Sequence, residues 1–382
     1  MREFFKIRTQ EEFGEACMEL FRYQVEQCDL YKEYVGLLGI EVKSVHTPEE
    51  IPMLPIKLFK SRQIVTSAHK VQKIQNREFT SGGTDSEHLS NVLDAVGKAE
   101  MLLNEEFDAI FTSSATTGMR PSKHYVRDIS LYERSFIEGF KLFYGNPEEY
   151  AILSLLPSYL ERKGSSLVYM AEKLMSMASE GGFYLYDHDK LYKKLCDLKS
   201  KGGKTILLGV TFALLDFVEK YRMEFPDLII LETGGMKGRG KEIPRDELHK
   251  ILKQGFGVER IHSEYGMAEL LSQAYSNGNG LFSTPPWMQI QISDLYDSSK
   301  RLSFTQNDTT IGKEPFKGSS NECRPGLTAT AQGRINIIDL ANINSCAFIE
   351  TEDIGRKYPD NTFTVDGRLK NSELRGCNML LG

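Results

Sequence analysis

Hydrophobic and polar residues alternate with two different periods in the middle of the chain. Short apolar runs, typical of buried strands, occur at 107–112, 150–157, 205–210 and 227–235. Longer amphipathic runs with the three-to-four spacing of helices occur between them, at 132–145, 166–179 and 213–225. Strands that alternate with helices predict βαβ units and a mostly parallel sheet flanked by helices, so we expect an α/β fold.

The two ends of the chain have other patterns. The first forty residues carry apolar positions at helical spacing, namely Phe13, Met18, Leu20, Phe21 and Val25. The prolines in IPMLPIKLFK (51–60) interrupt this pattern and indicate a connector. After about residue 280 the runs WMQIQISD and GRINIIDL are strand-like, and the polar stretch 297–326 between them predicts a long loop.

Composition narrows the class of protein. The chain has 382 residues and a formal net charge of −6, which gives no reason to expect a nucleic-acid binder. Charged residues interrupt the N-terminus, so we expect no signal peptide, and no run approaches the roughly 20 apolar residues of a membrane span. The six cysteines form no C-x-x-C pair, which disfavours a disulfide framework and a zinc site and favours a reducing, cytoplasmic location.

The segment SSATTGMRPSKH (113–124) follows a predicted strand. Its hydroxyl groups, its glycine and Lys123 are suited to binding a polyphosphate, although the Walker pattern G-x-x-x-x-G-K-[ST] is absent. The alternative interpretation is a Ser/Thr-rich surface turn. A similar segment, FTSGGTDSEH (79–88), contains no lysine, and we interpret it as a glycine turn.

Two further segments come directly after predicted strands. In LETGGMKGRGKE (231–242), Gly234 and Gly235 follow the strand at 227–232, where ligands bind in open parallel sheets. In IHSEYGMAELLSQAY (261–275), Tyr265 and Gly266 mark a turn, and Glu269 lies near the start of a predicted helical run. The aromatic ring is suited to stacking on a base and the carboxylate to holding Mg²⁺ between phosphates. The alternatives are a tight turn and an ordinary helix N-terminus.

Near the C-terminus, Asp353 and Arg368 adjoin strand-like segments in IETEDIGRKYPDNTFTVDGRLK (349–370). The carboxylate is suited to accepting hydrogen bonds from ribose hydroxyls, and the guanidinium to binding phosphate or ribose. The alternative for either residue alone is a surface ion pair.

In this order, SSATTG with SK, TGG, YGMAE, TED and GRLK resemble the motifs of the adenylate-forming superfamily of acyl-CoA synthetases, luciferases and adenylation domains. LPIKLFKS, SKHYVRD, ETGGMKGR and NSELRGC are most similar to the acyl-protein synthetases of bacterial bioluminescence, which work with fatty-acid reductases. The resemblance implies activation of a fatty or other carboxylic acid by ATP and Mg²⁺, then transfer of the acyl group to a thiol. That thiol would belong to the enzyme, to a partner acyl-carrier or reductase protein, or to coenzyme A.

The resemblance also implies residue roles. The phosphates would be held by Ser113, Ser114, Thr116, Thr117, Gly118 and Lys123. The adenine pocket would consist of Gly234, Gly235, Tyr265 and Gly266, the ribose would be bound by Asp353 and Arg368, and Mg²⁺ by Glu269. Cys377 would accept the acyl group as a thiolate, with an inert tail cysteine as the alternative.

The chain departs from the family pattern in several places. Ala115 replaces a glycine, Ala268 replaces a threonine, and the small C-terminal lid domain with its catalytic lysine is expected to be absent. We expect a helical part at 1–105, a nucleotide-binding core at 106–280, a β-rich subdomain at 281–370 and a tail at 371–382. Two other functions stay open, namely a CoA ligase of the phenylacetate type and a non-catalytic nucleotide-binding relative.

Overall fold

The computed structural model describes residues 3–67, 107–113, 120–157, 164–234, 243–297, 300–302 and 331–369. Its longer helices are α1 (Gln10–Gln27), α2 (Asp29–Leu37), α4 (Ile129–Tyr144), α6 (Ser166–Met177), α7 (His188–Lys201), α8 (Thr211–Lys220) and α9 (Arg245–Phe256). Short 3₁₀ segments include η4 (Ile56–Lys60). The strands are β1 (Leu54–Pro55), β2 (Ala109–Thr112), β3 (Lys123–Val126), β4 (Tyr150–Leu155), β5 (Glu180–Phe183), β6 (Lys204–Val210), β7 (Leu228–Thr233), β8 (Ile261–Tyr265), β9 (Ala274–Ser276), β10 (Phe282–Ser283), β11 (Met288–Ser293), β12 (Ala331–Asp339), β13 (Phe348–Lys357) and β14 (Phe363–Arg368).

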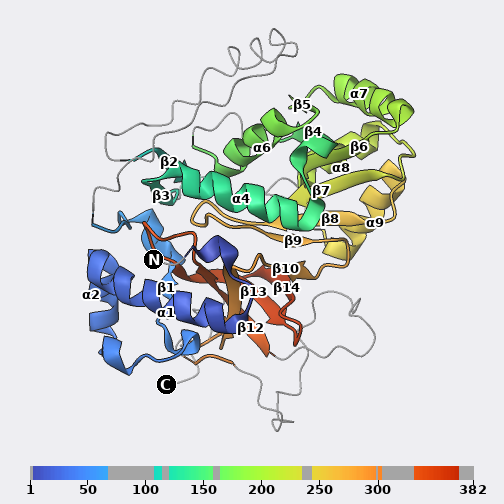
Figure 1. Cartoon of the computed structure of the whole chain (residues 1–382). Helices are drawn as coiled ribbons and strands as arrows, with labels where there is room; N and C mark the ends of the chain where they lie inside the picture. Colours follow the sequence, from blue (N-terminus) through green and yellow to red (C-terminus); the bar gives the residue numbers. More distant parts are fainter. Residues whose placement is uncertain are drawn as a thin grey trace, which may run out of the picture.

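Within the described residues, one 12-stranded sheet runs through the molecule in the order β11-β12-β13-β14-β10-β9-β8-β7-β6-β4-β5, with β1 paired to β13. The strands from β5 to β8 are parallel, and those from β8 through β14 to β11 are antiparallel. Figure 1 shows the parallel half with its helices above the antiparallel half. β2 and β3 form a separate hairpin beside them.

The parallel half forms because its central strands β4, β6 and β7 are largely apolar runs that are buried on both faces. All six residues of β4 are buried, as are six of the seven residues of β6. Helices α4 and α6 contact each other through Tyr132 and Tyr169, whose ring centroids lie 6.0 Å apart. The rings of Phe217 in α8 and Phe256 in α9 stack at 5.4 Å. The local sequence also sets the helix ends, since Asp128 caps α4 and Gly145, at φ +89°, ends it.

The antiparallel half is covered by the N-terminal helices. Tyr31 of α2 stacks on Phe348 of β13 at 5.8 Å, and Phe21 of α1 meets the same ring edge-on at 6.1 Å. The buried Gln24 amide donates to the Asn342 carbonyl oxygen at 2.8 Å, and its oxygen accepts from the Ala347 N–H. These contacts attach α1 and α2 to the turn between β12 and β13.

The α/β class predicted from the sequence is confirmed, with a large sheet flanked by helices. The predicted helical run after Glu269 is wrong. Residues 266–273 form a turn, and β9 follows it and pairs with β8. The amides of Leu271 and Ser272 donate to the Asp339 carboxylate, which prevents them from closing a helical turn. No helix in the described part of the chain combines the length and apolar character needed to cross a membrane.

Candidate functional site

Two glycines predicted for the base pocket, Gly234 and Gly266, lie at the same edge of the sheet. Thr233 of β7 and Glu264 of β8 lie opposite each other in parallel register, so Gly234 and Gly266 follow the carboxyl ends of neighbouring strands. Gly234 has φ +71°, a conformation that L residues rarely adopt. The carboxyl edge of parallel strands is where open α/β sheets bind ligands. Gly235 lies outside the described residues.

Glu264 is buried directly beneath Gly266. A Cβ atom at position 266 would collide with Oε1 of Glu264, while the Thr233 hydroxyl donates to Oε2. Burial raises the pKa of Glu264 to about 7 despite the hydrogen bond from Thr233. A side chain at position 266 would therefore force the end of the Glu264 side chain to move.

Tyr265, Asp353 and Arg368 form one hydrogen-bonded group. The Tyr265 hydroxyl donates to Oδ2 of Asp353 at 2.9 Å, and Nε of Arg368 donates to Oδ1 at 2.9 Å. The last two residues lie opposite each other across β13 and β14. Asp353 is buried, whereas 64% of the Arg368 side chain is exposed. The structure thus brings together three residues that are 88 and 15 positions apart in the sequence.

The environment of Tyr265 keeps its hydroxyl protonated. Its ring packs against Phe282 and Phe363, with centroids at 6.0 and 5.7 Å, and those two rings also contact each other. Burial, and then the neighbouring Asp353 carboxylate, raise the pKa of this tyrosine well above its usual value. The phenol is therefore a fixed donor to Asp353, and the ring is held edge-on by its aromatic neighbours.

Glu269 lies in the turn between β8 and β9 and is only 5% exposed. Burial raises the pKa of its carboxyl, while the Ser122 hydroxyl and the charges of Arg368 and Lys60 act in the opposite direction. Within the described residues, no three His, Cys, Asp or Glu side chains cluster in a way that could hold a metal ion.

The backbone of this turn is held by side chains from other elements. His124 of β3 lies with Nδ1 2.9 Å from the Ala268 carbonyl oxygen, and the Asn342 amide donates to the Glu269 carbonyl oxygen at 2.8 Å. Asp339 accepts the N–H groups of Leu271 and Ser272 at 2.8 and 3.0 Å. The turn therefore has a defined conformation without being part of a helix or strand.

The predicted phosphate-binding segment begins and ends in the β2–β3 hairpin. The Ser113 hydroxyl accepts the Ser122 N–H at 3.0 Å, and Thr112 lies opposite Lys123. Lys123 is exposed, whereas His124 is buried against the Glu269 turn, so strand alternation places Lys123 on the opposite face of the hairpin. The intervening residues with predicted roles, Ser114, Thr116, Thr117 and Gly118, lie outside the described residues, as does Cys377.

A surface hollow of about 500 Å³ lies elsewhere, at the amino ends of β4, β6 and β7. Tyr150, Lys204 and Ile229 contribute to its walls. It is at the opposite edge of the sheet from Gly234 and Gly266, so it is separate from the candidate site.

Sequence reasoning missed four residues of this site: Lys60, His124, Asp339 and Asn342. Lys60 and His124 stand within segments that resemble the family, LPIKLFKS and SKHYVRD, but the resemblance implies a role only for Lys123. Asp339 and Asn342 follow a strand-like run without any motif, and only the three-dimensional structure brings them to residues 268–272.

The chain matches no family model and no curated protein. Solved structures with a similar arrangement include a long-chain-fatty-acid-CoA ligase from Archaeoglobus fulgidus, at 15% identity and a TM-score of 0.45 over 72% of this chain and 54% of that one. The O-succinylbenzoate coenzyme A synthetase of Bacillus subtilis, in complex with AMP, has 16% identity and a TM-score of 0.42 over 68% and 49% of the two chains. A fatty acyl-adenylate ligase from L. pneumophila has 14% identity and a TM-score of 0.41 over 71% and 52%. The chain spans about half the length of these structures.

Proposed function

We propose that this protein uses ATP to activate a carboxylic acid, forming an acyl-adenylate and releasing pyrophosphate. One observation carries the proposal: the Tyr265–Asp353–Arg368 group and the Glu269 turn lie at the carboxyl edge of β7 and β8. The order of the sequence motifs supports the same function independently.

The nucleoside half of ATP would bind at the glycine edge. Asp353 already accepts two hydrogen bonds, and a carboxylate has further lone pairs that can accept from ribose hydroxyls. The exposed guanidinium of Arg368 would contact the ribose or the α-phosphate. Gly234 and Gly266 would allow the base to approach the backbone closely.

The phosphates would extend from this edge toward Glu269 and the β2–β3 hairpin. Mg²⁺ bound to ATP would neutralise phosphate charge when present, and Glu269 is the residue that would hold it. The acid's carboxylate oxygen would attack the α-phosphorus, forming a new O–P bond. The bond to the β-phosphate oxygen would break, and pyrophosphate would leave with that electron pair.

The second half-reaction that we propose is transfer of the acyl group from AMP to a thiol. We propose a fatty acid as substrate and Cys377 as the first acceptor, with a partner protein's thiol or coenzyme A as later acceptors. The thiolate would attack the acyl carbon, the C–O bond to AMP would break, and AMP would leave with that oxygen. The sequence resemblance supports this half, and residues 235–242 and 370–382 are outside the described part of the chain.

ATP–pyrophosphate exchange with short, long and aromatic acids tests the first half-reaction. We expect exchange that requires both Mg²⁺ and an acid, and that Glu269→Ala reduces by at least about a hundredfold, because a metal-binding carboxylate is lost. Glu172→Ala, which changes an exposed glutamate on α6, is the matched control. Absence of acid-dependent exchange, with or without added partner proteins, would contradict the proposal.

Intact-mass spectrometry after incubation with ATP and the preferred acid tests the second half-reaction. We expect an acyl adduct that hydroxylamine removes and that is absent from Cys377→Ser. Cys196→Ser removes an exposed cysteine on α7 and should leave the adduct intact. Exchange without an adduct would exclude Cys377 as the acceptor and leave the adenylation proposal standing.

A further inference from the structure

We propose that His124 and Asn342 are positioning residues that hold the Glu269 carboxylate in place relative to the phosphate-binding hairpin. The inference rests on the proposed function, because it assigns these residues a role through Glu269. The sequence analysis gives neither residue a role, although His124 ends the segment SSATTGMRPSKH. Both are buried, and each holds the turn by a different carbonyl group.

The two contacts fix successive peptide groups. Nδ1 of His124 is 2.9 Å from the carbonyl oxygen of Ala268, and Nδ2 of Asn342 is 2.8 Å from the carbonyl oxygen of Glu269. These carbonyls flank the backbone of Glu269 itself. When both peptide planes are held, the direction in which the Glu269 side chain leaves the turn is held as well.

Protonation chemistry assigns the donor of the first contact. A carbonyl oxygen only accepts, so Nδ1 of His124 must carry hydrogen. Burial lowers the pKa of His124 to about 4, although the Ala268 carbonyl and the Asn342 amide favour its charged form. The ring is therefore neutral near pH 7, with its one N–H directed at Ala268. The edge-on contact with Phe59, at 5.8 Å between centroids, restricts the ring plane.

The two residues come from different parts of the structure. His124 lies in β3, directly after Lys123, and its strand pairs with the one that leads into the phosphate-binding segment. Asn342 lies in the turn between β12 and β13, where its own N–H donates to the Asp339 carbonyl oxygen at 3.0 Å. A shift of the hairpin would therefore move the Ala268 carbonyl, whereas Asn342 and Asp339 hold the remainder of the turn to the antiparallel half.

A purely structural role would also explain buried hydrogen bonds, so the test needs a readout that stability alone does not change. Asparagine places its amide nitrogen near the position of Nδ1, whereas glutamine places it near Nε2 and leucine supplies no donor. We expect the kcat of ATP–pyrophosphate exchange to be within about threefold of wild type for His124→Asn. For His124→Leu we expect a fall of about 30-fold or more, with the KM for the acid unchanged.

Two controls separate positioning from loss of packing. His262→Leu changes a half-buried histidine on β8, which contacts Tyr144 of α4 rather than the Glu269 turn, and should lower thermal stability without lowering kcat. In the double variant His124→Leu/Glu269→Gln, the histidine change should have no further effect on kcat, because it acts through the missing carboxylate. Additive losses, or equal kcat values for His124→Asn and His124→Leu, would overturn the proposal.

Hydrogen exchange measured by mass spectrometry tests the same inference without any activity. Peptides covering 266–276 should exchange faster in His124→Leu and in Asn342→Leu than in wild type, and at the wild-type rate in His262→Leu. Unchanged protection of these peptides would contradict the positioning role even if adenylation were established. If adenylation failed while protection still changed as expected, the proposed function would be wrong and the structural link would remain.

Discussion

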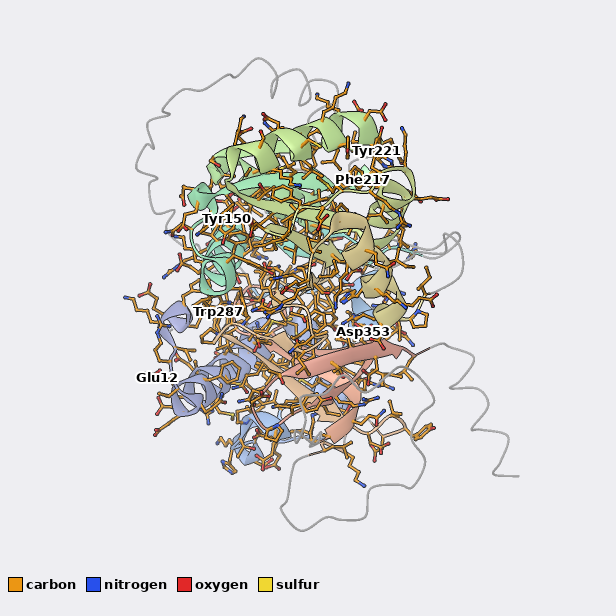
Figure 2. All side chains as sticks on the ribbon, turned by 90° about the vertical axis from the view of Figure 1, so that its right-hand side faces the viewer. Glu12, Tyr150, Phe217, Tyr221, Trp287 and Asp353 are labelled. Atoms are coloured by element: carbon orange, nitrogen blue, oxygen red, sulfur yellow. The ribbon has the colours of Figure 1, made fainter. Side chains whose placement is uncertain are left out.

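The polar side chains of the two halves of the sheet have different hydrogen-bond partners. In the parallel half, the polar side chains at the carboxyl edge bond mainly to one another, as in the pairs Thr211–Glu232 and Thr233–Glu264. In the antiparallel half, Asp339 and Asp353 bond to residues of the 265–272 segment, across the boundary between the halves. Figure 2 labels Asp353 and Trp287 at the level where the upper, helix-flanked part meets the lower, strand-rich part. The turn at 266–273 therefore follows a strand of the parallel half, and side chains of the antiparallel half hold it in place.

The contrast is clearest between two glutamates five positions apart. Glu264 belongs to the parallel half, has one described hydrogen-bond donor and holds its proton up to about pH 7. Glu269 lies in the turn, where Ser122, Arg368 and Lys60 oppose the effect of burial on the pKa of its carboxyl. Both are buried, but only the second has cations from other elements acting on it.

Removing the Asp339 carboxylate, which connects the antiparallel half to the 265–272 segment, should have the largest effect on stability. Asp339→Ala leaves the N–H groups of Leu271, Ser272 and Ala341 without their buried acceptor. We expect a loss of about 4 kcal/mol in the free energy of unfolding, measured by urea denaturation. Asp294→Ala removes an acceptor from a surface turn and should cost about 1 kcal/mol. Equal losses for the two variants would show that the boundary has no special stabilising role.

The next largest effect is a pH dependence of stability that comes from the protonation of Glu264. Its native pKa of about 7 lies above the unfolded value of 4.5, so the native state keeps a proton that the unfolded chain releases between these pH values. The stability that this group contributes is complete below about pH 4.5 and is lost as the pH rises through 7. The free energy of unfolding of Glu264→Gln, measured by urea denaturation, should therefore increase relative to that of wild type as the pH rises. We expect this difference to grow by roughly 3 kcal/mol from pH 4.5 to pH 8. A pH-independent difference would contradict this account.

Asp353→Asn tests the antiparallel contribution to nucleotide binding. The amide keeps the shape of the side chain but removes the charge that Arg368 and Tyr265 contact. We expect the KM for ATP in pyrophosphate exchange to rise about 20-fold, with a smaller change in kcat. Asp366→Asn disrupts another ion pair between β13 and β14, with Arg356 at 3.2 Å, and should leave the KM within about twofold. Similar effects of both variants would remove the case for a ribose site at Asp353.

Lys60 gives the smallest predicted effect. Its charge acts on Glu269 from η4, so Lys60→Ala should raise the pKa of that carboxyl further. We expect the acid limb of the exchange profile to move to higher pH and the rate at pH 7 to fall about fivefold. Lys57→Ala, on the same 3₁₀ segment, breaks a partly exposed ion pair with Glu352 and should leave the acid limb and the rate at pH 7 unchanged. If the acid limb did not move in Lys60→Ala, the role of Lys60 would be only structural.

Sequence periodicity predicted the parallel half because its buried strands and amphipathic helices have clear patterns, as at β4 and α6. It failed at 266–275, where the apolar residues Met267, Leu270, Leu271 and Ala274 have helical spacing. Asp339, 68 positions after Leu271, accepts the amides that a helix would use. The same reason explains the missed site residues. Motifs identified Tyr265, Asp353 and Arg368, whereas the side chains that hold Glu269 in place are recognisable only from long-range hydrogen bonds.

Oxygen transfer from the acid to AMP tests the central claim most directly. The wild-type protein would be incubated with Mg²⁺, ATP, hydroxylamine as acyl acceptor and an acid labelled with ¹⁸O in its carboxylate, and AMP would be analysed by mass spectrometry. Attack of the carboxylate on the α-phosphorus predicts AMP that carries one ¹⁸O atom, in amounts equal to the acyl hydroxamate formed. Unlabelled AMP, or release of ADP and phosphate instead, would contradict the account.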